Sequence, residues 1–290
     1  MSIVIPHYGD PKHALSLVNQ LLGQRGLDAM EIIVVDDASP IAFPEAVDQR
    51  VTVVRRTSNG GFGSAVNHGA AYATHPWLLI MNSDVLVEPA TVRNLLDATP
   101  VRALSGPAVR TAGRIEATGR LFPSAGRIAL ARVHVLQRFH SRPRYLKAIG
   151  VDLSAVPGQS SHVDWLAGVV MLLPTEVFRE VGGFDTSFFM YCEETDLQRR
   201  LADLGVPRVL VGSVEVEHAG GASSAPDRTQ SWLTSSQLRY AEKWGGHRRT
   251  RAAMRGVALV NFATGALRRV AGRPTRPLAD LRRELRDISG

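Results

Sequence analysis

Residues 31–37 read Glu-Ile-Ile-Val-Val-Asp-Asp, an apolar, β-branched run that ends in two carboxylates. A run without polar alternation predicts a strand buried on both faces, which is typical of a parallel sheet covered by helices. Further runs of this kind occupy residues 2–6, 51–55 and 77–81. Between them, residues 11–24 carry Ala14, Leu17, Val18, Leu21 and Leu22 at helical spacing, and residues 63–74 can form a second helix. Alternating strands and helices predict an α/β fold made of βαβ units.

The second half of the chain is less regular. Residues 100–162 scatter Gly, Pro and Arg without a strong period and are interpreted as a mixed connection. Residues 163–173 predict a strand that runs through Gly168, followed by a short helix from Pro174. Residues 206–211 and 214–217 predict two more strands, and residues 231–244 predict a helix.

Polar side chains follow the predicted strands at their carboxyl ends. Asp36 and Asp37 end one strand, and Asn82 and Asp84 follow another. Because ligands of open α/β sheets bind at the carboxyl ends of the strands, we expect these side chains to face one crevice. An aspartate there can hold a divalent cation on a diphosphate, although Asn-Ser-Asp is also ordinary turn chemistry.

Residues 188–196, Phe-Phe-Met-Tyr-Cys-Glu-Glu-Thr-Asp, place three carboxylates directly after an aromatic stretch. Leu197, Leu201 and Leu204 keep helical spacing, so the acids occupy a helix N-terminus, where the dipole offsets part of their charge. Desolvation and crowding of like charges are expected to raise at least one pKa and create a general base. The alternative is that the acids only favour the start of the helix.

Three weaker motifs complete the set, and each has a structural alternative. Asn59-Gly60-Gly61-Phe62-Gly63, followed by Asn67, lets backbone N–H groups approach a ligand, or forms a plain turn. His218 precedes a glycine pair and is a metal ligand or a structural histidine. The indole in Asp164-Trp165 stacks on a sugar ring or lies in the core.

Charge separates the end of the chain from its body. The formal net charge is +7, and residues 247–290 contain eleven arginines against three acidic residues, so the preceding part is nearly neutral. A basic segment of this kind suits an anionic membrane surface or nucleic acid, and its mildly apolar centre, residues 256–267, resembles an interfacial helix. A helix packed on the body is the alternative. Cys192 is the single cysteine, and no secretory signal or membrane span is visible, so a cytoplasmic location is expected.

The order of these motifs along residues 1–245 resembles the family 2 glycosyltransferases of GT-A fold, and most of all the bacterial rhamnosyltransferases of cell-wall and polysaccharide assembly. The resemblance implies a GT-A-type αβα sandwich with a mainly parallel central sheet in residues 1–245, followed by a basic helical extension in residues 246–290. It also implies inverting transfer of a sugar, L-rhamnose from dTDP-rhamnose, from a nucleoside-diphosphate donor to a hydroxyl of a lipid-linked or polysaccharide acceptor.

The resemblance also assigns roles to residues. The expected catalytic residues are Glu194, Glu193 and Asp196, with Glu194 in the usual place of the base. The expected donor-binding residues are Pro6, His7, Tyr8, Asp36, Asn59, Gly61, Asn67, Asn82 and Asp84. Asp164 and Trp165 are expected to line the acceptor pocket, and Asp84 with His218 to bind Mg²⁺ or Mn²⁺.

The chain departs from the family pattern at Glu194, where the family has Asp, and this leaves Glu193 and Asp196 as competitors for the base. Asn82 replaces the first metal-site aspartate, which weakens the metal site on charge grounds, and His7-Tyr8-Gly9 replaces the commoner Thr-Tyr-Asn.

Two other classes of protein stay open at this stage. A nucleotidyltransferase acting on a sugar phosphate shares a similar sheet and a metal aspartate. A basic nucleic-acid-binding protein would explain the tail but not the acidic crevice, so no nucleic-acid partner is expected. Association with the inner face of the membrane and an oligomeric state are both compatible with the sequence.

Overall fold

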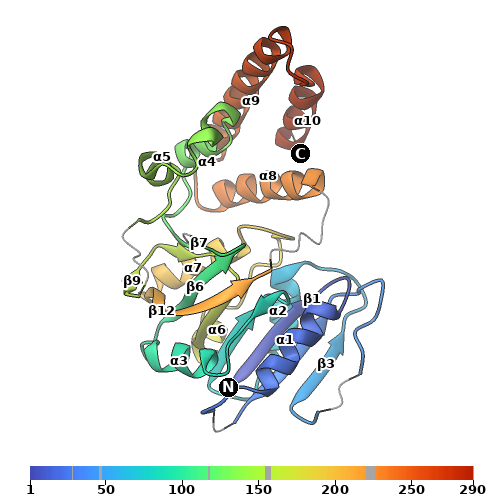
Figure 1. Cartoon of the computed structure of the whole chain (residues 1–290), viewed down its shortest axis with the longest axis vertical. Helices are drawn as coiled ribbons and strands as arrows, with labels where there is room; N and C mark the ends of the chain where they lie inside the picture. The colour runs from blue at the N-terminus through green and yellow to red at the C-terminus, as the bar shows by residue number, and fades with distance from the viewer. Residues whose placement is uncertain (28, 46–47, 117, 154–157, 220–225, 290) are drawn as a thin grey trace. The chain divides into compact units, whose positions relative to one another are not determined.

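The computed structural model describes residues 1–27, 29–45, 48–116, 118–153, 158–219 and 226–289 (Figure 1). The chain divides into two compact units. The first unit comprises Met1–Arg120 and Ser154–Ser224, and the second unit comprises Leu121–Leu153 and Ala225–Gly290.

The first unit is built on one large mixed sheet. Its strand order is β3 (Val51–Arg55), β2 (Glu31–Asp36), β1 (Ser2–His7), β4 (Trp77–Met81), β11 (Val170–Pro174), β6 (Leu104–Thr111), β12 (Arg208–His218) and β5 (Val85–Leu86). β3, β2, β1 and β4 are parallel, as are β6 and β12, while β11 runs antiparallel between β4 and β6. β7 (Arg114–Glu116) pairs with β6, β9 (Ser160–His162) pairs with β12, and β10 (Trp165–Leu166) pairs with β8 (Gly119–Arg120).

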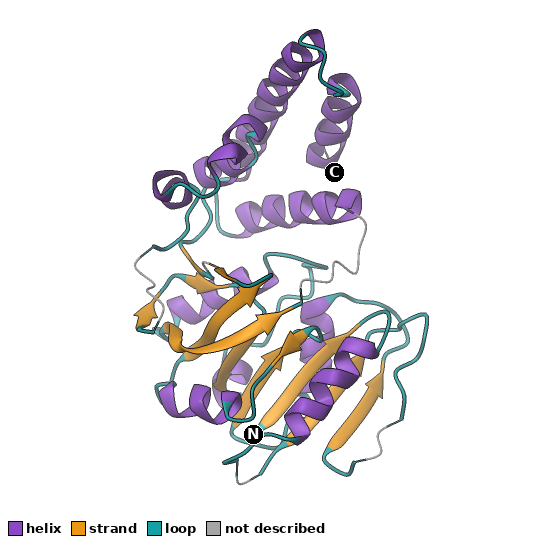
Figure 2. Cartoon of the chain, in the orientation of Figure 1, coloured by secondary structure: helices purple, strands orange, loops and turns teal. Residues whose placement is uncertain are grey.

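Helices cover both faces of this sheet because its strands are apolar on both faces. Successive side chains of a strand point to opposite faces. Ile3 and Ile5 of β1 therefore join a core with α1 (Lys12–Leu22) and α3 (Thr91–Ala98), whereas Val4 joins a second core. That second core contains α2 (Phe62–Ala70), α6 (Thr175–Glu180) and α7 (Glu193–Asp203). The predicted αβα layers and mainly parallel sheet are confirmed (Figure 2).

The region read as a mixed connection contains a central strand, β6, which the sequence analysis missed. Its sequence, Leu-Ser-Gly-Pro-Ala-Val-Arg-Thr, carries Gly106 and Pro107, which ordinarily argue against a central strand. The structure accommodates both residues. β11 pairs with β6 only at Ser105, so Pro107 needs no N–H there, and a Cβ on Gly106 would lie 2.7 Å from the Val170 carbonyl oxygen.

Two other strand predictions are corrected. The strand expected to run through Gly168 is broken into β10 and β11, because the chain turns at Ala167–Val169, where the Val169 N–H donates to the Ala167 carbonyl at 2.8 Å. The two strands expected at 206–211 and 214–217 are one strand, β12, whose register to β6 shifts between Val211 and Glu215.

The second unit is helical and has its own small core. It contains α4 (Ala125–Ala131), a 3-10 helix (His134–Phe139), α5 (Pro143–Ala148), α8 (Pro226–Lys243), α9 (His247–Val270) and α10 (Pro277–Ser289). Ile128, Leu238, Met254 and Ile288 form the core. The Asn261 side chain accepts from the His134 N–H at 3.0 Å and donates to the Arg132 carbonyl at 3.1 Å, which fixes α9 to residues 121–153.

The predicted basic helical C-terminal region is therefore present. The predicted boundary at residues 245/246 falls between α8 and α9, which belong to the same unit here, so this division of the chain stays a prediction. Within the described part of the chain, none of the helices combines the length and the apolar composition that a bilayer crossing requires.

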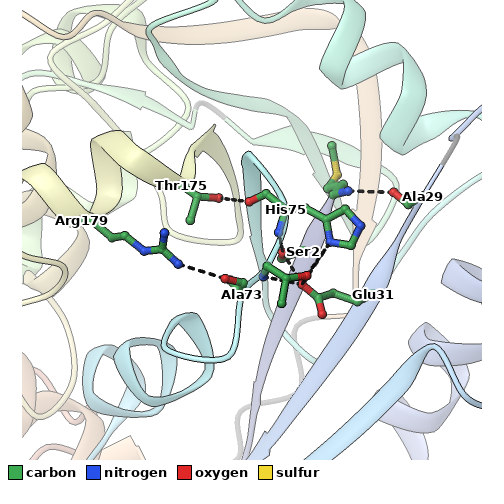
Figure 3. Close-up of polar contacts among 9 residues, drawn as sticks. Ser2, Ala29, Glu31, Ala73, His75, Thr175 and Arg179 are labelled. Atoms are coloured by element: carbon green, nitrogen blue, oxygen red, sulfur yellow. Dashed lines mark hydrogen bonds and ion pairs between the residues drawn. The ribbon is translucent and has the colours of Figure 1, made fainter.

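A network of hydrogen bonds around Glu31 fixes the amino ends of β1, β2 and β4 (Figure 3). The Glu31 carboxylate accepts from Ser2 Oγ at 2.6 Å, from the Thr74 N–H at 2.7 Å and hydroxyl at 2.8 Å, and lies 3.1 Å from His75 Nδ1. Burial raises the pKa of Glu31, but these hydrogen bonds outweigh it and lower the pKa to about 2 from an ordinary 4.5. The network lies at the end of the sheet opposite to the strand ends that carry Asp36 and Asp84.

We expect Glu31→Gln to reduce the free energy of unfolding at neutral pH by about 2 kcal/mol. Because the folded-state pKa lies below the unfolded one, the stabilisation is complete above about pH 4.5 and is lost as the pH falls toward 2. Urea unfolding as a function of pH measures this. Glu180→Gln, which removes a surface ion pair with Arg102, is the control and is expected to change stability by less than about 1 kcal/mol. Parallel pH dependence of Glu31→Gln and wild type would contradict the expectation.

Candidate active site

The acidic run forms the first turn of α7, as the sequence predicts (Figure 1). Two consecutive non-glycine residues precede it in the left-handed region, Tyr191 with φ 71° and Cys192 with φ 64°. Such conformations cost free energy and persist only where the surroundings impose them, which occurs often at functional sites. The start of α7 at Glu193 therefore coincides with local backbone strain.

The three carboxylates of the run have different environments. Asp196 is fully buried and accepts from Arg200 Nε at 2.9 Å, while Arg200 also donates to the carbonyls of Val181 and Gly183. Glu193 is 5% exposed, and Glu194 is only partly buried. Among the described residues, neither Glu193 Oε2 nor Glu194 Oε2 has a hydrogen-bond partner. Asp196 thus serves an internal ion pair, whereas the two glutamates keep acceptor atoms that no described group uses.

The same differences appear in the acid–base properties of the run. Burial raises the pKa of Glu193 well above its ordinary value, and the charge of Glu194 raises it further. Burial also raises the pKa of Glu194, although the N–H groups of Glu194 and Thr195 and the Arg120 guanidinium act against it. Two adjacent carboxyls with raised pKa values can accept a proton near neutral pH, as a general base must.

Residues 164–168 lie against the start of α7. Gln198, one turn after Glu194, accepts from the Leu166 N–H at 2.7 Å and donates to the Leu166 carbonyl at 2.8 Å. A Cβ on Gly168 would lie 3.2 Å from Glu194 Cβ. These contacts hold Asp164 and Trp165, both partly buried, beside the acidic run. The segment that carries the two residues predicted for the acceptor pocket is thereby packed against the helix that carries the predicted base.

The glycine-rich loop connects the end of β2 with the segment before α7. Asp37 is buried, pairs with Arg56 and accepts from the N–H groups of Gly60 at 3.1 Å and Gly61 at 2.9 Å. Gly61 has φ 83°, and a Cβ there would lie 1.8 Å from the Phe189 carbonyl oxygen. No other residue fits, because the two backbones touch at this point.

Asn59 and Asn67 differ in exposure and contacts. Asn59 is exposed and its Oδ1 accepts from the Gly61 N–H at 3.1 Å. Asn67 accepts from the Phe184 N–H and donates to the Phe184 carbonyl, both at 2.8 Å. The Asn67 carboxamide therefore ties α2 to residues 183–184, a structural task that the sequence analysis did not predict.

At the ends of β1 and β2, the predicted donor-binding residues are mostly buried. Asp36 is fully buried, accepts from the N–H groups of Ser39 at 2.8 Å and Phe43 at 3.1 Å, and pairs with Arg55. Burial raises the pKa of Asp36, and these bonds more than offset that effect, so its pKa is lowered. Pro6 and His7 are also buried, with the His7 ring edge-on to Phe43, whereas Tyr8 is 46% exposed. Tyr8 is the residue of this group with the most surface for a ligand.

The two predicted metal ligands lie together. His218 Nε2 is 3.1 Å from Asp84 Oδ1, and the hydrogen bond to Asp84 raises the pKa of His218 against the effect of burial. The described residues contain no cluster of three or more His, Cys, Asp or Glu side chains that could hold a metal ion. One carboxylate and one imidazole fit a divalent cation whose other ligands are diphosphate oxygens and water. The glycines after His218, Gly220 and Gly221, lie outside the described residues.

A continuous series of contacts joins these groups at one edge of the sheet. Asp37 holds Gly61, Gly61 touches Phe189, and α7 begins a few residues later with Glu194 against Gly168. Next to Gly168, the Val169 carbonyl accepts from the Asn82 N–H at 2.9 Å, which places the strand end that carries Asp84 and its partner His218. The sites predicted near positions 36, 84 and 194 are thus connected through the backbone.

Three residues with evident tasks at this edge were missed by sequence reasoning: Arg120, Gln198 and Arg200. The last two stand four residues after Glu194 and Asp196, a helical spacing that could have indicated their contacts. Arg120 lies in the stretch without periodicity, and only the pairing of β8 with β10 brings it near Glu194.

Comparisons with known proteins agree with this geometry. The family model described as glycosyl transferase family 2 matches residues 2–104. The N-acetylglucosaminyl-diphospho-decaprenol L-rhamnosyltransferase of Mycobacterium tuberculosis is 32% identical over 219 residues, which cover 68% of this chain and 69% of the relative. The rhamnosyltransferase WbbL of Escherichia coli is 42% identical over 62 residues, covering 20% of this chain and 24% of that one.

A solved structure shows the same fold. The mannosyltransferase PcManGT from Pyrobaculum calidifontis, in complex with GDP-Man and Mn²⁺, superposes with a TM-score of 0.60 at 16% identity, covering 97% of this chain and 77% of that one. Together with the relatives, this confirms the GT-A fold, and the rhamnosyltransferase relatives favour a glycosyltransferase over the nucleotidyltransferase and nucleic-acid-binding alternatives. The chain is a glycosyltransferase and belongs to family 2.

Proposed function

We propose that this enzyme transfers L-rhamnose, with inversion, from dTDP-rhamnose to a hydroxyl of an N-acetylglucosaminyl diphospho-lipid. The name and coverage of the mycobacterial relative support the sugar and the acceptor class. One observation carries the mechanism: of the three clustered acids, Glu194 alone is partly exposed, keeps a buried acceptor atom without a described partner, and lies against Gly168, in the segment that follows Asp164 and Trp165.

In this mechanism Glu194 is the general base. Its carboxylate takes the proton of the acceptor hydroxyl, and the freed oxygen attacks the anomeric carbon from the side opposite the diphosphate. The new C–O bond forms as the bond between the anomeric carbon and the diphosphate oxygen breaks, and the nucleoside diphosphate leaves with the electron pair. Glu193 next to it is more deeply buried, and burial together with the charge of Glu194 raises the pKa of Glu193.

Asp84 and His218 are the residues that would hold a divalent cation, Mg²⁺ or Mn²⁺. Their 3.1 Å separation and mixed carboxylate–imidazole chemistry support that assignment. When bound, the cation neutralises charge on the leaving diphosphate. Because Asp84 is the only carboxylate of the pair, we expect the cation to bind only when the diphosphate supplies further ligands.

The donor is proposed to lie over the ends of β1, β2 and β4. Exposed Tyr8 and Asn59 and the backbone of Gly61 support this position, with Asn82 and Asp84 toward the diphosphate. The side chains of Asp36, Pro6 and His7 are buried, so their proposed role is indirect. They would shape the loop at Ser39–Phe43 instead of contacting the donor themselves. Asn67 would contribute through its hold on Phe184.

The second unit is proposed to bind the anionic surface of the membrane that carries the acceptor. α9 exposes an apolar stripe that includes Leu259 (57%), Val260 (46%), Leu267 (71%) and Val270 (88%). Exposed arginines accompany it: Arg255, Arg269, Arg273 and Arg276. An apolar face flanked by arginines is typical of helices that lie in the membrane interface, and each arginine contributes up to about 1 kcal/mol near anionic lipid.

Glu194→Gln tests the base. We expect kcat for rhamnosyl transfer to fall about 10²- to 10⁴-fold while the affinity for dTDP-rhamnose is unchanged, because the amide cannot accept the proton. Initial rates of dTDP release and calorimetric donor titration measure the two quantities. Glu215→Gln on the surface is the matched control. Undiminished turnover of Glu194→Gln, or an equal collapse in Glu193→Gln alone, would remove Glu194 from the role.

Asp84→Asn tests the cation site. In wild type, Mn²⁺ is expected to increase the thermal stabilisation by dTDP-rhamnose, and EDTA to abolish that increment. The variant should lose the increment and lower kcat/KM, because its amide is a weaker ligand than a carboxylate. Asp97→Asn, on the exposed surface of α3, is the control. A variant that still responds to Mn²⁺ as wild type does would argue against Asp84 as a ligand.

Arg269→Glu with Arg273→Glu tests the membrane surface. The full-length protein is expected to sediment with phosphatidylglycerol vesicles in a salt-sensitive way and not with phosphatidylcholine vesicles. The double variant should lose this binding and keep its melting temperature. Equal sedimentation of both proteins, or equal binding to both lipids, would contradict the proposal.

A further inference from the structure

Arg120 is a half-buried cation whose Nε atom is buried and has no hydrogen-bond partner among the described residues. It ends β8 and pairs in register with Trp165 of β10, in the segment that Gln198 fixes to α7. Burial lowers the pKa of the Arg120 guanidinium, and the charges of Glu116 and Glu194 raise it. A buried guanidinium is costly unless a charge nearby compensates it. Arg120 therefore lies under the influence of two carboxylates, Glu116 of β7 first and Glu194 of the acidic run second.

The charged groups around Glu194 differ in their effect on it, and Arg120 has a distinct role among them. On α7 itself, Glu193 is buried beside Glu194, and Asp196 is already neutralised by Arg200. Cys192, directly before the helix, is buried, and burial raises the pKa of its thiol, so it supplies no charge. From the packed strands come Arg120 on β8 and Glu116 on β7, with Asp164 directly before β10. Arg120 is thus the cation that acts on Glu194.

We propose that Arg120 is the positioning residue of the base: from its place opposite Trp165 in the β8–β10 pair, its guanidinium holds the Glu194 carboxylate in position when the acceptor hydroxyl arrives. This inference rests on the proposed role of Glu194. Two adjacent carboxyls in apolar surroundings tend to share one proton, and a shared proton blocks the base in part of the molecules. A cation against the outer member of the pair biases the proton toward Glu193, the more deeply buried one.

The pH dependence of kcat/KM for dTDP-rhamnose and an N-acetylglucosaminyl diphospho-lipid tests this inference. The acid limb of that profile reports the protonation of the base in the free enzyme. In Arg120→Met and Arg120→Gln we expect the acid limb to move upward by roughly 1–3 pH units, since loss of a neighbouring cation favours the protonated form. Arg120→Lys keeps the charge and should restore the limb to within a fraction of a unit of wild type.

Controls separate this role from simple structural damage. Arg114→Met removes an exposed arginine of β7 and should leave the profile unchanged. Thermal melting shows whether Arg120→Met and Arg120→Gln are folded. Only a folded variant enters the comparison of pH profiles. An acid limb at its wild-type position in a folded neutral variant overturns the inference, even if the rate falls evenly at all pH values. A raised KM for the acceptor without movement of the limb overturns it as well and assigns Arg120 to substrate binding.

The proposed function and the inference about Arg120 fail on different results. If the wild-type enzyme does not transfer rhamnose to this acceptor, or if Glu194→Gln keeps full turnover, the proposed function fails. If the wild-type enzyme transfers with an acid limb that Glu194→Gln removes, and Arg120 variants leave that limb in place, only the inference about Arg120 fails.

Discussion

The site depends on the bond between the buried Asp37 carboxylate and the N–H groups of Gly60 and Gly61. That bond fixes the glycine loop where its backbone touches the carbonyl of Phe189. The parallel strands of the first half of the chain and the acidic helix of the second half meet at this contact. Because the approach is closer than any side chain allows, the position of α7 follows from a loop that belongs to the other half of the fold.

A second constraint acts on α7 itself. Its first turn holds three acids in apolar surroundings, which is unfavourable for charged groups. The helix N-terminus, the Arg200 ion pair and the Arg120 cation each offset part of that cost, and they do so unequally. The outcome is one neutralised acid, one deeply buried acid and one acid that reaches the surface with spare hydrogen-bonding capacity. The three carboxylates of this run differ from one another because their burial and their neighbouring charges differ.

Much of the fold could be predicted because its signals are local. The strands at 2–6, 31–35, 51–55 and 77–81 and the helix after Cys192 agree with the structure within about two residues, and both expected metal ligands lie side by side. β6 could not be predicted, because Gly106 and Pro107 argue against a strand unless the neighbouring strand is known. The break at Gly168 was missed because the turn at Ala167–Val169 lies inside an otherwise apolar run that carries no proline or other clear turn signal.

The sequence by itself determined which residues are candidates for the chemistry: the acids of 193–196, Asp84, His218 and the glycines of 59–63, since composition and spacing are properties of the chain alone. Only the tertiary structure decided how those residues divide the work. It assigned Asn67 to Phe184 and Arg120 to the neighbourhood of Glu194. The physical reason is that burial and charge compensation depend on what packs against a side chain, and each of these outcomes depends on a segment distant in sequence or on the burial that packing produces.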